Sequence, residues 1–194
     1  MCYGLDNAGL PRHITQIVLQ DVIATWVVTP TTPGNISNLL RKSRIAVLCS
    51  LVGRELLSDG VLSSLHAVEA ALRQRIVDSG ASGVDRRGAP LAWNNLFQRA
   101  VSLGLLNREP DEADRDLIDY GRELRNSLSH PSAVLYLTYA AALPLMETSH
   151  RVVSRLYPPV AEDKPGGAGE PQALVFRRGA TGSDTATDHT EAHN

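Results

Sequence analysis

Large apolar residues recur every three or four positions over most of the chain, from residue 36 to residue 157. This is the spacing of helices that bury one face. Glycine, proline and short polar residues interrupt the pattern and divide it into five segments, 36–57, 61–76, 91–103, 110–128 and 131–157. The pattern therefore predicts an all-α fold, a four- to five-helix up-and-down bundle over residues 36–157.

The two ends of the chain differ from this middle region. Residues 13–29 are rich in Ile, Val and Thr, which favours a strand, but their apolar residues also fit helical spacing. We therefore treat residues 1–35 as an N-terminal arm of uncertain structure. Residues 158–194 hold few large apolar groups apart from LVFRR (174–178), and we expect a disordered tail that could dock through that segment.

Charge and composition narrow the class of protein. The net charge is −2, and residues 36–157 carry 15 Arg and Lys against 13 Asp and Glu. Binding of nucleic acid by bulk positive charge is excluded, so any such contact has to be local. The chain shows neither a signal peptide nor an apolar run long enough to cross a membrane, which predicts a cytoplasmic protein. Cys2 and Cys49 lie too far apart for a metal motif, and we expect no metal and no cofactor.

One polar stretch, RELRNSLSHP (122–131), stands where one helical segment gives way to the next. Pro131 pushes His130 out of the helical region and suits the first turn of a new helix. His130 can then turn back towards Arg125, beside the unpaired N–H groups of that helix, which attract anions. The stretch predicts a site for a phosphate group. In the alternative interpretation the arginines are solvated and His130 only caps a helix.

A second polar cluster lies on an earlier segment. His66, Glu69 and Arg73 are spaced i, i+3 and i+7, which places them on one helix face. They flank the apolar stripe instead of opposing it. Glu69 and Arg73 could be a simple exposed ion pair, or they could border a cleft and hold the first cluster in place.

Together the two clusters resemble the HEPN domain family, small helical bundles common in prokaryotic toxin–antitoxin, abortive-infection and RNA-processing systems. The family motif is Arg, a polar residue that is often Asn, and then His after a short spacer; RNSLSH, Arg125 to His130, matches it. An acidic residue followed four positions later by Arg or Lys is also frequent on an earlier helix. EAALR, Glu69 to Arg73, matches that element.

The resemblance implies a metal-independent endoribonuclease that acts as a homodimer with a composite site. The RNA 2′-OH would attack the adjacent phosphate and leave 2′,3′-cyclic phosphate and 5′-OH ends. His130 would move the proton, Arg125 would stabilise charge on the phosphoryl oxygens, and Asn126 would orient the site. Glu69 and Arg73 would be supporting residues.

An antitoxin or another regulatory protein is a further expected partner, but one departure bears on it. Some HEPN toxins carry a tyrosine two residues after the histidine that a partner antitoxin modifies. This chain has Ser132 there, which argues against that route. Two alternatives stay open: a non-catalytic HEPN module that binds nucleotide or RNA or serves as a dimerisation scaffold, and a helical interaction protein that works through its tail.

Overall fold

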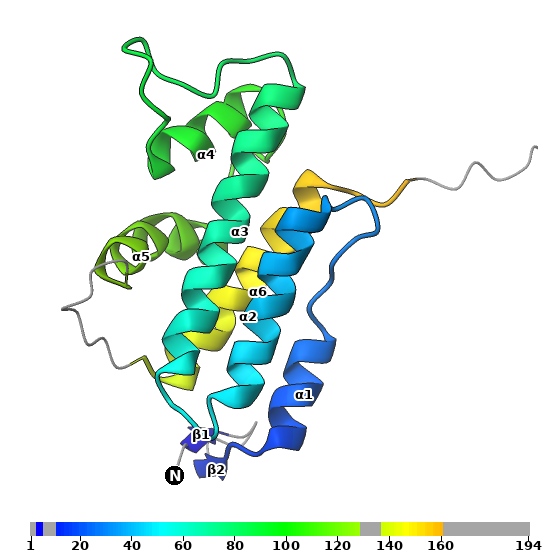
Figure 1. Ribbon diagram of the computed structural model, residues 1–194, viewed down its shortest axis with the longest axis vertical. Helices are drawn as coiled ribbons and strands as arrows, with labels where there is room; N and C mark the ends of the chain where they lie inside the picture. Colours follow the sequence, from blue (N-terminus) through cyan, green and yellow to red (C-terminus); the bar gives the residue numbers. More distant parts are fainter. Residues whose placement is uncertain (1–2, 6–10, 129–136, 161–194) are drawn as a thin grey trace, which may run out of the picture. The chain divides into compact units, whose positions relative to one another are not determined.

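The computed structural model describes residues 3–5, 11–128 and 137–160 (Figure 1). Within these ranges the chain forms six helices and two three-residue strands, which confirms the all-α class. The helices are α1 (Gln16–Ala24), α2 (Gly34–Cys49), α3 (Leu56–Asp78), α4 (Trp93–Ser102), α5 (Glu112–Leu128) and α6 (Tyr139–Leu156). The strands β1 (Tyr3–Leu5) and β2 (Pro11–His13) pair antiparallel, with Tyr3 opposite His13.

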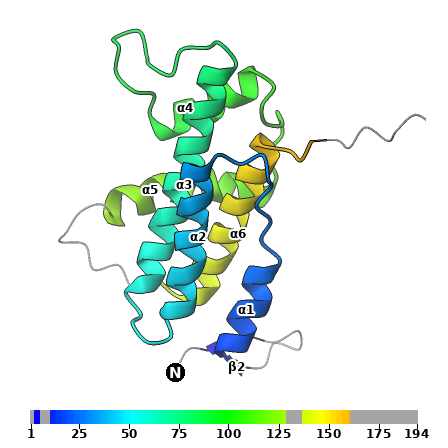
Figure 2. The same ribbon diagram turned by 45° about the vertical axis from the view of Figure 1, so that its right-hand side comes forward.

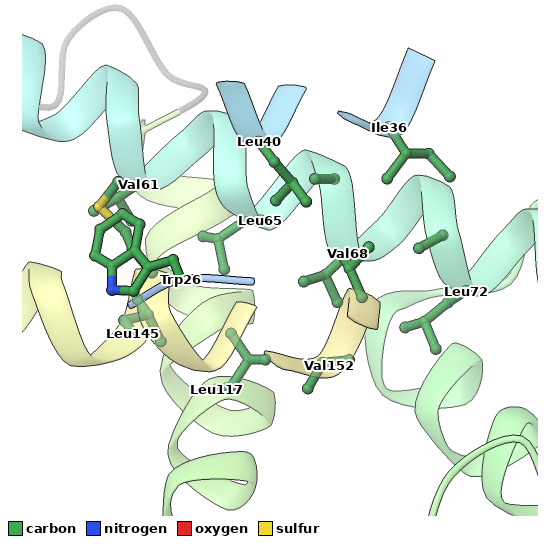
Figure 3. Close-up of a cluster of buried hydrophobic side chains, with 14 of the residues drawn as sticks. Trp26, Ile36, Leu40, Val61, Leu65, Val68, Leu72, Leu117, Leu145 and Val152 are labelled. Atoms are coloured by element: carbon green, nitrogen blue, oxygen red, sulfur yellow. The ribbon is translucent and has the colours of Figure 1, made fainter. Parts of the chain in front are cut away.

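Helix α3 is the centre of the bundle. It runs beside α2 and α6, and α4 and α5 pack against it as well (Figures 1 and 2). Its apolar stripe, Val61, Leu65, Val68 and Leu72, is fully buried. Figure 3 shows this stripe meeting side chains from α2, α5 and α6, so a single core holds these helices together.

The N-terminal segment is part of this core from residue 16 onwards. The ambiguous stretch forms helix α1, whose first turn is capped by the Thr15 hydroxyl accepting from the Val18 N–H. Leu19, Ile23 and Trp26 are buried against the bundle. Propensity for strand is overridden here because the apolar residues of α1 gain more by packing on the bundle than by extending.

The boundary between the first two helices differs from the expected one. Ser58, Asp59 and Gly60 were expected to end a helix, but they lie inside the first turns of α3. The break comes earlier, between Cys49 and Leu56. Gly60 is needed for packing: a Cβ there would lie 3.2 Å from the Ser43 carbonyl oxygen of α2, so the missing side chain lets the two helices approach closely.

The last helix also begins later than expected. It starts at Tyr139 and not at Pro131, and the Thr138 side chain accepts from the Ala141 N–H as an N-cap. By contrast, α4 ends close to the expected residue 103: its last residue is Ser102, and Gly104 follows the C-cap Leu103 with a φ of +72°, a conformation that glycine adopts without strain. The expected disordered tail lies outside the described residues from 161 onwards. In the described part of the chain no helix is both long and apolar enough to cross a bilayer.

Candidate functional site

Glu69 is the centre of a charged cluster where α3 meets α5. Its Oε1 accepts from Arg73 Nη2 at 2.7 Å, one turn further along α3. Its Oε2 lies 2.8 Å from Nε of Arg125, and Oε1 also accepts from Arg125 Nη2 at 3.1 Å. The Glu69 side chain is only 13% exposed, and the two arginines are about one third exposed. The structure thus joins the two sequence clusters, 56 residues apart, through one carboxylate.

This geometry fixes the direction of Arg125. One hydrogen bond, from Nη2 to Oε1, and a close ion pair between Nε and Oε2 hold the guanidinium group against this carboxylate, although the Nε–H itself is not aligned for a hydrogen bond. A long and flexible side chain would otherwise sample many rotamers. Glu69 therefore positions Arg125 before any ligand arrives.

Arg73 has a different part in the cluster. Besides its contacts to Glu69, its Nη2 donates to the Leu91 carbonyl oxygen at 2.9 Å. Leu91 lies in the loop before α4, so Arg73 ties that loop to α3. The supporting role that the HEPN resemblance gives to Arg73 stays a prediction.

A glycine brings the two helices close enough for the cluster to form. A Cβ on Gly121 of α5 would lie 3.0 Å from Trp93 Cζ2 and 3.2 Å from Leu65 Cδ2. The Trp93 indole N–H donates to the Ile118 carbonyl oxygen at 3.0 Å, which attaches α4 to the same stretch of α5. Arg125 follows Gly121 by one turn, so this close packing sets the position from which it reaches Glu69.

His66 borders the cluster. It lies one turn before Glu69 on α3 and is half-buried. Partial burial and the positive charge of Arg125 lower the pKa of its imidazole, and Glu69 opposes the change. Lys42, on α2, is close enough to lower this pKa further. Partial burial and the nearby arginine thus favour the neutral form of the imidazole.

Of the other two predicted site residues, Asn126 and His130, the structure describes only Asn126. Asn126 follows Arg125 and is exposed near the end of α5. His130 lies outside the described residues. Pro131, where the next helix was expected to begin, also lies outside the described residues, and the described helix α6 starts at Tyr139.

A second feature of α5 lies away from this cluster. A pocket of about 540 Å³ lies between α5 and α6. Most of the residues that line it are apolar, among them Tyr120, Leu124 and Pro144. On an ideal helix Tyr120 points 140° away from Arg125, so the pocket opens on another face of α5.

Sequence reasoning gave no role to a buried histidine on α6. His150 is fully buried; its Nδ1 lies 2.9 Å from the Met146 carbonyl oxygen, and its Nε2 accepts from Arg44 Nε at 3.3 Å. Burial lowers its pKa to about 4. It is held as a neutral ring against Trp26, with 4.8 Å between ring centroids, and therefore belongs to the core.

Chemically, the cluster can hold and orient positive charge. Two arginines share one carboxylate, so a net positive charge remains on the cluster that His66 borders. That combination suits an anionic ligand such as a phosphate. Among the described residues no group of three or more His, Cys, Asp and Glu side chains could hold a metal ion.

The chain was compared with family models, with curated proteins and with solved structures, and none of them matches it.

Proposed function

We propose that this protein is a HEPN-type endoribonuclease that needs no metal ion. The observation that carries the proposal is the ion pair between Glu69 and Arg125, which includes one hydrogen bond. In the sequence, the EAALR and RNSLSH elements are two short motifs that chance could produce. Their meeting in space, with the carboxylate aimed at the motif arginine, is not required by either motif alone.

The proposed reaction follows from RNA's own chemistry. The 2′-oxygen forms a bond to the adjacent phosphorus, and the bond from phosphorus to the 5′-oxygen breaks. A proton leaves the 2′-OH and another reaches the departing 5′-oxygen, and His130 serves one of these transfers. An unperturbed imidazole titrates near pH ~6.5, which suits this role. The products are a 2′,3′-cyclic phosphate and a 5′-OH.

Arg125 supplies the electrostatic part. Negative charge grows on the phosphoryl oxygens as the new bond forms, and a guanidinium already held in place loses little on reorganising. Glu69 provides that placement, and Arg73 donates to the same carboxylate. Asn126, exposed beside Arg125, orients the end of the helix or the RNA. A homodimer that brings two such clusters to one cleft, and a regulatory partner protein, belong to the same proposal.

The test is cleavage of labelled RNA by the purified full-length protein in EDTA. We expect cleavage by the wild type with 2′,3′-cyclic phosphate ends, and at least a 100-fold loss in both Arg125→Ala and His130→Ala. The matched control is Arg115→Ala, which removes an exposed arginine from the same helix, α5, far from Glu69.

Two outcomes would contradict the proposal. Cleavage that EDTA abolishes would point to metal-dependent chemistry. Absence of cleavage with all variants folded, together with retained binding of RNA or nucleotide, would favour the non-catalytic module. Light scattering during gel filtration measures whether the protein is the expected dimer.

A further inference from the structure

The pocket between α5 and α6 has the form of a groove. Its volume is about 540 Å³, and its walls are residues of these two helices together with Leu137, just before α6. On α5 the lining residues recur every three or four positions from Ala113 to Ser127, which corresponds to about 21 Å of helix. The space is therefore elongated along the helices, and it fits a long ligand better than a compact one.

The walls of this groove expose apolar groups that the core leaves uncovered. Tyr120 of α5 is 58% exposed, and Ala140 and Ala141 of α6 are exposed as well. Leu145 lies buried between them and the core. A tyrosine supplies a large apolar surface with a polar end, and the two alanines leave room for another backbone to approach. Such a surface suits a contact with a second protein.

Pro144 adds a hydrogen-bond acceptor to the same wall. It lies inside α6 and has no N–H, so the Ala140 carbonyl oxygen lacks the donor that a helix normally supplies four residues later. Both residues line the groove. A ligand that carries N–H groups can donate to this oxygen.

The charged residues of the groove are acidic. Asp116 and Glu123 line it, are exposed, and stand seven positions apart on one face of α5. In the part of the chain that the structure describes, neither carboxylate forms an ion pair, whereas Asp114 of the same helix is paired with Arg155. None of the lining residues is a lysine or an arginine. The groove therefore offers two negative charges that only a ligand can balance.

These charges decide which occupant fits. In a two-fold contact between two copies of the chain the same surface meets itself, so carboxylates would face carboxylates. The phosphates of RNA would be repelled in the same way. A ligand that carries basic groups beside an apolar surface matches both the charge and the apolar walls.

We propose that this groove binds an amphipathic helix of another protein, which inserts an apolar stripe between α5 and α6 and places two Lys or Arg residues against Asp116 and Glu123. Helices that dock in grooves use apolar anchors at i, i+3 or i+4 and i+7. Basic residues seven positions apart lie on one face of such a helix, as the two carboxylates do on α5. The binding does not depend on whether the protein cleaves RNA.

Synthetic peptides of about 20 residues, long enough to span the groove, test the proposal. The first has leucines at i, i+3 or i+4 and i+7 and two lysines seven positions apart at the edge of that stripe. The second has glutamates in place of the lysines, and the third has the composition of the first in scrambled order. Fluorescence anisotropy at low salt measures their binding to the full-length protein. We expect the lysine peptide to bind with a Kd below about 100 μM and the other two at least tenfold more weakly.

Variants of the protein locate the contact. The double variant Asp116→Lys with Glu123→Lys should bind the lysine peptide about tenfold more weakly and should now prefer the glutamate peptide. Asp119→Lys with Glu147→Lys is the matched control: it makes the same charge change at exposed positions of α5 and α6 that do not line the groove, and it should change affinity less than two-fold. Ala141→Trp fills the groove from an exposed position and should abolish binding, while circular dichroism verifies that each variant is folded.

Several results would overturn the proposal. They are absence of binding by the lysine peptide, binding that Ala141→Trp leaves unchanged, or equal losses in the control and the charge-reversed variant. A dimer that Ala141→Trp dissociates, measured by light scattering during gel filtration, would assign the groove to a second copy. Tighter peptide binding by Phe176→Ser would show that the chain itself competes for the groove, and would likewise refute its assignment to a partner.

Discussion

Replacing Glu69 by Gln tests whether one carboxylate organises the site. The substitution keeps the size of the side chain and removes its charge. Glu69 is 13% exposed and faces two guanidinium groups at 2.7 and 2.8 Å. The variant leaves both arginines with a neutral amide, which still accepts a hydrogen bond but no longer balances their charge.

The burial of Glu69 and its two arginines sets the loss of stability that we expect from this substitution. Hydrogen bonds to charged groups contribute about 1.5–3 kcal/mol each where they are buried. Both arginines are about one third exposed, and water recovers part of the loss. We therefore expect the free energy of unfolding to fall by about 2 kcal/mol, less than the sum of two buried contacts. For a domain of this size the melting temperature falls by about 4–8 °C.

Two assays measure the result. Thermal and urea unfolding give the stability, with Asp78→Asn as the control, because it removes one acidic charge from an exposed pair with Gln74 on the same helix. That control should cost less than about 0.5 kcal/mol. NMR titration gives the pKa of His66, which should fall further, since Glu69 is the group that raises it. If Glu69→Gln is no less stable than Asp78→Asn, or the His66 pKa does not fall, the cluster does not organise the site as we describe.

Two further predictions concern the packing around the site and the core. Gly121→Ala should lower the free energy of unfolding by up to about 2 kcal/mol, because the new Cβ would lie 3.0 Å from Trp93 and 3.2 Å from Leu65, and this strain outweighs the gain in helix propensity. Gly34→Ala is the control in the same urea titration: the space around its Cβ is open, so the substitution should be neutral or stabilising. The folded protein should lose stability as the pH falls from about 6.5 towards 4, because His150 has a pKa of about 4 when folded and the unfolded chain binds its proton first. This contribution reaches about 3 kcal/mol at full protonation, and His150→Gln should remove it from the pH profile of urea unfolding; an unchanged profile would contradict the assignment.

The sequence alone determined the helical class and most helix positions, because the spacing of apolar residues reports which face each helix buries. It also marked Glu69, Arg73 and Arg125 as residues with possible chemistry, since charged groups at helical spacing beside an apolar stripe are visible in one dimension. The roles of these residues, and of Asn126 and His130, stay predictions.

The tertiary structure decided the contacts between elements, which the spacing of residues along the chain does not determine. Gly60 looks like a helix end in the sequence, but it lies inside α3, where α2 approaches too closely for a side chain. Strand propensity in the N-terminal segment gave way to α1, because burial of Trp26 and its neighbours depends on surfaces supplied by the rest of the chain. The contact of Glu69 with Arg125 is of the same kind: the crossing of α3 and α5 sets it, and no local pattern encodes that crossing.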